Sequence, residues 1–194
     1  MSKIHLKNVR LSFPDIFTAK AFQEGDEPKF KAAFLLGEKH PQRKEIEKVI
    51  NDVATAKWGP KAKKILDGIR SNPNKFCYQD GNNKDYDGYA DHWYISASNK
   101  ARPTVIDRDR SPLTAEDGRP YAGCYVNAII EIFAYTTSGN GIAASLSGIQ
   151  FLKDGEPFSG GRAAAADDFD DLSDQGDDGE GATAGDDDDL DNLG

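Results

Sequence analysis

Apolar and polar residues alternate in several segments of the first 160 residues, and this alternation is typical of half-buried β-strands. The parity of the apolar residues changes near Asn8, which predicts a bulge in the first strand. Beyond the bulge, Phe13 shares a face with Val9 and Leu11. Pro14 should end that strand. The predicted strands are 4–13, 29–37, 92–98, 104–107, 124–137 and 142–152.

Two helices interrupt the strands. Apolar residues recur at helical spacing from Pro41 to Lys57, and Gly59 and Pro60 separate this helix from a shorter one over 61–69. Residues 71–91 read as a loop rich in glycine and asparagine, and 138–141 as a hairpin loop. The fold class that follows is mainly β, an OB-fold-like antiparallel β-barrel with a helical insertion, because closure removes exposed sheet edges.

Charge divides the 194 residues into two parts. All 24 Lys and Arg lie in residues 1–162, together with 20 of the 33 Asp and Glu, so this part has a formal net charge of +4. The other 13 acidic residues follow Arg162, where no basic residue occurs. We therefore expect a mildly basic globular domain over 1–160 and a disordered acidic tail over 161–194, since the tail has little apolar area to bury.

Signals for catalysis or metal binding are weak. Cys77, Cys124 and His92 lack the spacing of a zinc site, and residues 83–88 resemble a calcium loop that has no glutamate at its twelfth position. Asp107 and Asp109 are the best carboxylates for a metal-dependent nuclease, but arginines alternate with them. No nucleotide-binding fingerprint occurs. We expect no enzyme, cofactor or bound metal, and keep the nuclease as an alternative.

Aromatic and basic residues occur together in the predicted loops and on polar strand faces. Rings that stack on bases, with cations that follow the phosphates, are what sequence-tolerant binding of a single strand requires. The predicted DNA-binding residues are Lys29, Lys31, Lys75, Tyr78, Lys84, Tyr86, Tyr89, Trp93, Tyr94, Lys100, Arg102, Arg108 and Arg110.

The acidic tail suggests a competitor for the same cationic site. Residues 167–172 and 188–193 share the pattern Asp-Asp-apolar-Asp-x-Leu, which suggests two docking copies for a partner protein. The predicted partner-binding residues of the tail are Phe169, Leu172, Leu190 and Leu193. An acidic protein-interaction module that never binds DNA is the second alternative.

Several segments together resemble a family of phage single-stranded DNA-binding proteins that was long labelled a domain of unknown function. They are 9–17, 28–36, Tyr89, 97–98, 102–103, 121–127 and 139–141. The resemblance implies an OB-fold, a role in phage DNA replication or recombination, and an acidic C-terminus that contacts replication proteins such as a DNA polymerase or helicase. The chain departs from similar proteins in ending on Leu193 and Gly194 rather than an aromatic residue.

Other expectations concern location and assembly. No run of about 18 apolar residues and no signal sequence occurs, so we expect no membrane contact and a place in the host cytoplasm. A homodimer is kept open.

Overall fold

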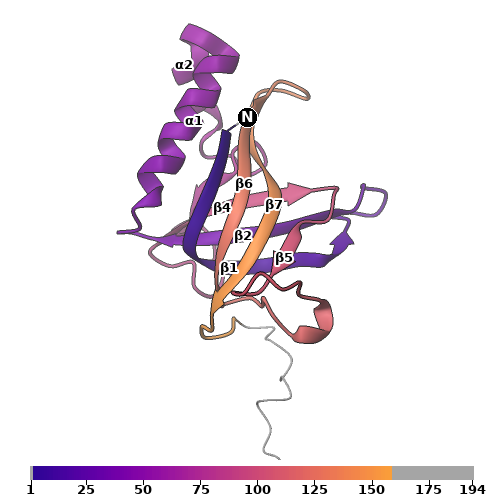
Figure 1. Ribbon diagram of the computed structural model, residues 1–194. Coiled ribbons are helices and arrows are strands. Elements are labelled where there is room, and N and C mark those ends of the chain that lie inside the picture. Colours follow the sequence, from indigo (N-terminus) through magenta and orange to yellow (C-terminus); the bar gives the residue numbers. More distant parts are fainter. Residues whose placement is uncertain (1, 159–194) are drawn as a thin grey trace, which may run out of the picture. The chain divides into compact units, whose positions relative to one another are not determined.

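The computed structural model describes residues 2–158, which form a barrel with a helical pair at one side (Figure 1). Its strands are β1 (Ser2–Lys20), β2 (Lys29–Gly37), β3 (Tyr78–Asp80), β4 (His92–Asn99), β5 (Thr104–Ile106), β6 (Tyr125–Tyr135) and β7 (Gly141–Lys153). Its α-helices are α1 (Gln42–Trp58) and α2 (Ala62–Ile69), and the short 3₁₀ turns are η1 (Gly59–Lys61), η2 (Gly81–Asn83) and η3 (Ala115–Asp117).

Five strands close the barrel in the order β1-β2-β4-β7-β6 and back to β1. Four of the five pairings are antiparallel, and the fifth joins β4 to β7 in parallel through Ser98 and Ser145. The short β5 also pairs with β7 in parallel. The predicted OB-like barrel with a helical insertion is therefore confirmed, although it is not wholly antiparallel. In the sequence, α1 and α2 are inserted between β2 and β4, the second and third strands of the barrel.

The first strand is longer than the sequence predicts. Asn8 has a φ of 52°, and the pairing with β6 shifts between Leu6 and Val9, so the predicted bulge is present. The prediction that Pro14 ends the strand is wrong, because β1 continues to Lys20. The pairing with β2 is already interrupted around Pro14, and the missing N–H of this residue is therefore tolerated.

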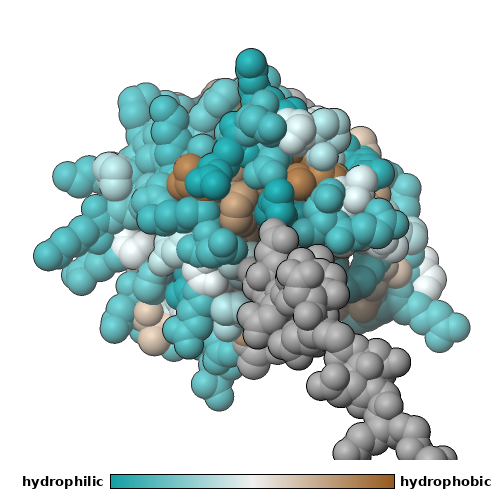
Figure 2. Space-filling view, turned by 60° about the horizontal axis from the view of Figure 1, so that its bottom comes forward, coloured by the Kyte–Doolittle hydropathy of each residue, from teal (hydrophilic) through white to brown (hydrophobic). Residues whose placement is uncertain are grey.

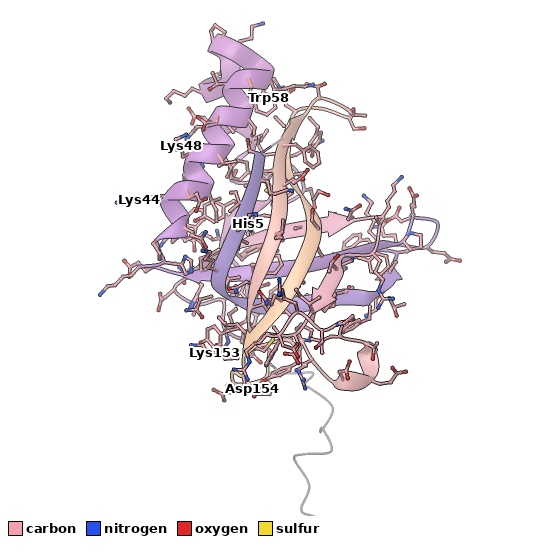
Figure 3. All side chains as sticks on the ribbon, in the orientation of Figure 1. His5, Lys44, Lys48, Trp58, Lys153 and Asp154 are labelled. Carbon is pink, nitrogen blue, oxygen red and sulfur yellow. The ribbon has the colours of Figure 1, made fainter. Side chains whose placement is uncertain are left out.

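The barrel interior and α1 share one apolar core. Ile46, Ile50 and Val53 of α1 pack into the cluster formed by the inward faces of the strands, as the helical spacing predicts. Lys44 and Lys48 project from α1 away from the barrel (Figure 3). Among the described residues, no helix has the length and apolar character needed to cross a membrane.

A second apolar cluster lies outside this core. It contains Ala33 and Leu35 of β2, Tyr94 of β4, Tyr89 and Phe158. Because successive residues of a strand point to opposite faces, Ala33 and Leu35 lie on the outer face of β2, opposite Phe34 in the core. The outer surface of β2 and β4 is therefore partly apolar, and it is covered by the chain around Tyr89 and Phe158.

The acidic tail and its predicted partner-binding residues lie outside the described part of the chain. The domain boundary at residue 160 and the disorder expected for 161–194 therefore stay predictions, as do the roles of Phe169, Leu172, Leu190 and Leu193.

Candidate nucleic-acid interface

A groove of about 450 Å³ crosses the outer face of β2 and β4 and reaches the hairpin between β6 and β7. We call it the β2–β4 groove. This is the surface by which OB-folds bind oligonucleotides, together with the loop between the first two strands and the loop between the last two. Its lining residues are Phe13, Lys31, Ala32, Ala33, Pro73, Asn74, Phe76, Cys77, Tyr86, Tyr89, Tyr94, Ser96, Ala97, Ser98, Tyr135, Ile142, Ala143 and Ala144.

Four aromatic rings form a continuous cluster along one side of the groove. Ring centroids lie 4.9 Å apart for Phe13 and Tyr86, 5.3 Å for Tyr86 and Tyr89, and 5.1 Å for Tyr89 and Tyr94. Tyr86 is 49% exposed and Phe13 is 51% exposed, whereas the other two are buried. In this cluster, the solvent-exposed rings of Phe13 and Tyr86 pack against buried tyrosine rings.

The buried rings are held by their surroundings. The hydroxyl of Tyr89 donates a hydrogen bond to Ser12 Oγ at 3.1 Å, and burial raises the pKa of Tyr89 to about 12. Burial also raises the pKa of Tyr94 above its ordinary value. Both phenols are therefore neutral at physiological pH, and they act as an apolar support for Tyr86 and Phe13 rather than as free stacking surfaces.

Lysines lie at both ends of the groove. Lys31 lines it, with its Nζ 3.5 Å from Asp15 Oδ2 and 6.0 Å from the centre of the Phe22 ring. At the other end, Lys75 donates a hydrogen bond to the backbone carbonyl of Ser138 in the β6–β7 hairpin. The groove therefore has one cation in its lining, Lys31, and a second, Lys75, between the lining residues Asn74 and Phe76.

Two other predicted lysines lie beside the β1–β2 loop, near Lys31. Lys29 is exposed at the start of β2, and Lys100 follows β4, where it pairs with Glu27 of that loop. They extend the basic edge beyond the groove.

Tyr78 and Trp93 lie at a different site. They line a second concavity beside the N-terminal part of α1, and their ring centroids are 4.9 Å apart. Arg43 covers the Trp93 ring at 5.5 Å. Tyr78 is only 2% exposed, so its ring has no free face for a base. The sequence prediction placed Tyr78 in an open loop, but it belongs to β3 and packs in the core.

Of the eight predicted cations, only Lys31 lines the β2–β4 groove, and the four not yet described lie in turns and loops. Arg108 and Arg110 are exposed in the turn after β5, and Arg102 is exposed between β4 and β5. Lys84 is half-buried just after η2, in the loop that leads to Tyr86. The structure thus assembles Lys31, Tyr86, Tyr89 and Tyr94 from the predicted set, with Lys29, Lys75 and Lys100 nearby.

Sequence reasoning missed three aromatic residues of this surface. The alternation of β1 predicts that Phe13 shares a face with Val9 and Leu11, which are buried, but its φ of 46° breaks the alternation and its ring is exposed. Phe22 is 82% exposed in the β1–β2 loop, and Tyr135 ends β6 beside the hairpin. The exposed position of Phe22 in a polar turn was the one signal available in the sequence.

The residues of the alternative chemistries are engaged in structural contacts. Asp107 accepts a hydrogen bond from Arg119 at 2.6 Å, which lowers the pKa of its carboxyl, and Asp109 accepts hydrogen bonds from Ser111. Burial raises the pKa of both Cys77 and Cys124 to about 12, which opposes the thiolate form that zinc needs. Within residues 2–158, no three His, Cys, Asp or Glu residues come together as metal ligands.

Comparison with known proteins agrees with this geometry. Residues 2–180 match the model of a family described as the single-stranded DNA-binding protein of Enterobacter phage Enc34. The chain belongs to this family. It is also 50% identical, over 173 residues, to the putative protein p50 of Acyrthosiphon pisum secondary endosymbiont phage 1, a match that covers 88% of this chain and 94% of that protein.

Solved structures extend the comparison to the fold. The single-stranded DNA-binding protein from bacteriophage Enc34, solved in complex with single-stranded DNA, is 25% identical to this chain, with a TM-score of 0.69. The match covers 81% of this chain and 89% of the Enc34 protein chain. Gp2.5 of bacteriophage T7, a single-stranded DNA-binding protein, shares the fold at 11% identity and a TM-score of 0.53. The match covers 95% of this chain and 99% of gp2.5. The Enc34 family consists of binding proteins, which agrees with the expectation that the chain is not an enzyme.

Proposed function

We propose that this protein binds single-stranded DNA in the β2–β4 groove, with little dependence on sequence, during phage DNA replication or recombination. The observation that carries the proposal is the pair of half-exposed rings, Tyr86 and Phe13, with Lys31 at the groove. Every base has a π-face, so stacking on such rings tolerates any sequence, and lysines neutralise the phosphates. The Enc34 relative solved with single-stranded DNA supports the proposal.

The groove favours a single strand over a duplex for a geometric reason. A base can stack on Tyr86 or Phe13 only if its own face is free, and bases in a duplex are stacked on one another. The groove also lies on the outer face of a sheet, and none of the residues that line it belongs to α1 or α2, whereas an α-helix is what commonly enters the major groove of a duplex.

A titration of labelled oligonucleotides by the full chain in EDTA tests the proposal. We expect retention of single-stranded DNA, weaker retention of a duplex of the same length, and a fall in affinity with salt of about 0.7 decades per decade for each phosphate neutralised. A requirement for magnesium with the appearance of shorter fragments would favour the nuclease. Absence of any binding would favour the protein-interaction module.

We further propose that the acidic tail competes with DNA and recruits replication proteins. A polyanion tethered to a cationic groove acts at an effective concentration of up to millimolar, so weak affinity suffices for occupancy. Deletion of residues 163–194 should therefore raise DNA affinity, most strongly at low salt, where the attraction is least screened. Equal affinity of the two forms at every salt concentration would leave recruitment as the tail's role.

A further inference from the structure

The last described residues fold back onto the barrel beside the β2–β4 groove. Phe158 is 8% exposed and belongs to the cluster of Ala33, Leu35, Tyr89 and Tyr94. Its N–H donates a hydrogen bond to the carbonyl of Ala122 at 3.1 Å. The segment that joins β7 to the acidic tail is therefore packed under two rings of the groove.

Arg10 holds this segment in place. Its guanidinium lies 4.4 Å from the centre of the Phe158 ring, and it donates hydrogen bonds to the carbonyls of Gly123 at 2.9 Å and Glu156 at 2.7 Å. One planar group thus makes a stacking contact and two directed hydrogen bonds, which a lysine cannot reproduce. We call the contact of Arg10 with residues 156–158 the Arg10 clasp.

The ring of Phe158 also supports the loop that carries Tyr86. Gly88 lies directly against it, since a Cβ at Gly88, whose φ is 79°, would collide with the ring. The next residue, Tyr89, donates its backbone N–H to the carbonyl of Tyr86 at 3.2 Å. The contacts therefore run from Arg10 through Phe158 to Gly88 and Tyr89, and from there to the exposed ring of Tyr86.

From these contacts we infer that Phe158, held by the Arg10 clasp, is a positioning residue of the DNA-binding site. It fixes the loop of Tyr86 and the ring of Tyr89 from beneath and does not itself meet the strand. The inference rests on the proposed function and adds residues 156–158, beyond the last barrel strand, to the machinery of the groove.

The test uses the full chain with Phe158→Ala, Phe158→Leu, Tyr86→Ala and the double variant Phe158→Ala/Tyr86→Ala. We expect Phe158→Ala to weaken binding of an oligo-dT about tenfold, the order expected when one stacking ring is misplaced. Phe158→Leu keeps apolar volume and should restore most of the affinity. The double variant should bind about as weakly as Tyr86→Ala alone, because both changes remove the same contact.

Phe151→Ala is the matched control. Phe151 is 6% exposed and lies under Arg119 at 5.7 Å, but it belongs to the barrel core. We expect it to lower the melting temperature at least as much as Phe158→Ala and to leave the affinity of the folded protein unchanged. If Phe158→Ala does not fold, Arg10→Lys replaces it, and we expect a loss of DNA affinity in the same direction, because lysine cannot make the contacts of the Arg10 guanidinium with residues 156–158. If Phe151→Ala does not fold, Phe151→Leu replaces it, and we again expect unchanged affinity.

Hydrogen exchange of the free protein separates this inference from the proposed function. Phe158→Ala should speed exchange over residues 84–89, whether or not DNA binds. Unchanged exchange there, or losses of affinity that multiply in the double variant, would overturn the positioning role. Equal binding by wild type and Tyr86→Ala would instead count against the proposed site, and the exchange result would still decide the role of Phe158.

Discussion

Replacing Tyr86 by alanine separates DNA binding from stability. Its ring is half exposed and touches Phe13 and Tyr89, so truncation removes only part of a buried ring and should cost about 1–2 kcal/mol of unfolding free energy. If a base stacks on the ring, the stacking contributes about 1–3 kcal/mol to the free energy of DNA binding, so its removal corresponds to a loss of affinity of roughly 5- to 150-fold. Tyr86→Phe keeps the stacking face and should bind at nearly wild-type strength.

Tyr78→Ala is the informative contrast, because the sequence alone places both tyrosines in the same loop. Tyr78 is buried in the core, so its truncation should cost roughly 3–5 kcal/mol and lower the melting temperature markedly. Its folded fraction should still bind DNA normally. Fluorescence anisotropy with a labelled oligo-dT and thermal melts on both variants make the comparison. Loss of affinity in Tyr78→Ala with wild-type affinity in Tyr86→Ala would refute the placement of the groove.

Three further predictions follow from charge and burial. Lys31→Gln should reduce the slope of log affinity against log salt by about 0.7, while Lys63→Gln on α2, 89% exposed and away from the groove, should leave it unchanged in the same titrations. Because burial raises the pKa of the Cys77 and Cys124 thiols to about 12, neither should react with a thiol reagent at pH 8 until denaturant is added, and fast native labelling would contradict this. The neutral Tyr89 phenol is favoured by folding, with its pKa raised from 10 to about 12, so its contribution to stability should persist below pH 10 and be lost between pH 10 and 12. In denaturant melts, the unfolding free energy of wild type should therefore fall relative to that of Tyr89→Phe over that range, and a constant difference between the two proteins would contradict the shift.

The barrel could be predicted from local pattern because its strands alternate. The predicted strand 29–37 coincides with β2, since Ala32, Phe34 and Leu36 all face the core. The end of β1 could not be predicted in the same way, because Pro14 is tolerated only where the pairing with β2 is already interrupted. That interruption is a property of the paired strands and not of the segment alone.

The site was harder to predict than the fold. Tyr78 and Tyr86 lie in one stretch rich in glycine and asparagine, and only the pairing of β3 with β4 buries the first and leaves the second open. The reverse holds for Phe13, because the alternation places it on the same face as the buried Val9 and Leu11, whereas its left-handed backbone leaves its ring exposed. Residue type therefore indicated the chemistry, whereas tertiary contacts decided which rings are accessible.

Photo-crosslinking tests the location of the strand most directly. A single-stranded oligonucleotide that carries iododeoxyuridine is bound to the full chain, irradiated and mapped by mass spectrometry. We predict crosslinks at the exposed rings of Phe13, Phe22 and Tyr86, and at the partly buried ring of Tyr135 in the groove lining. Crosslinks confined to Trp93 beside α1, or to the turn of Arg108 and Arg110, would contradict binding in this groove.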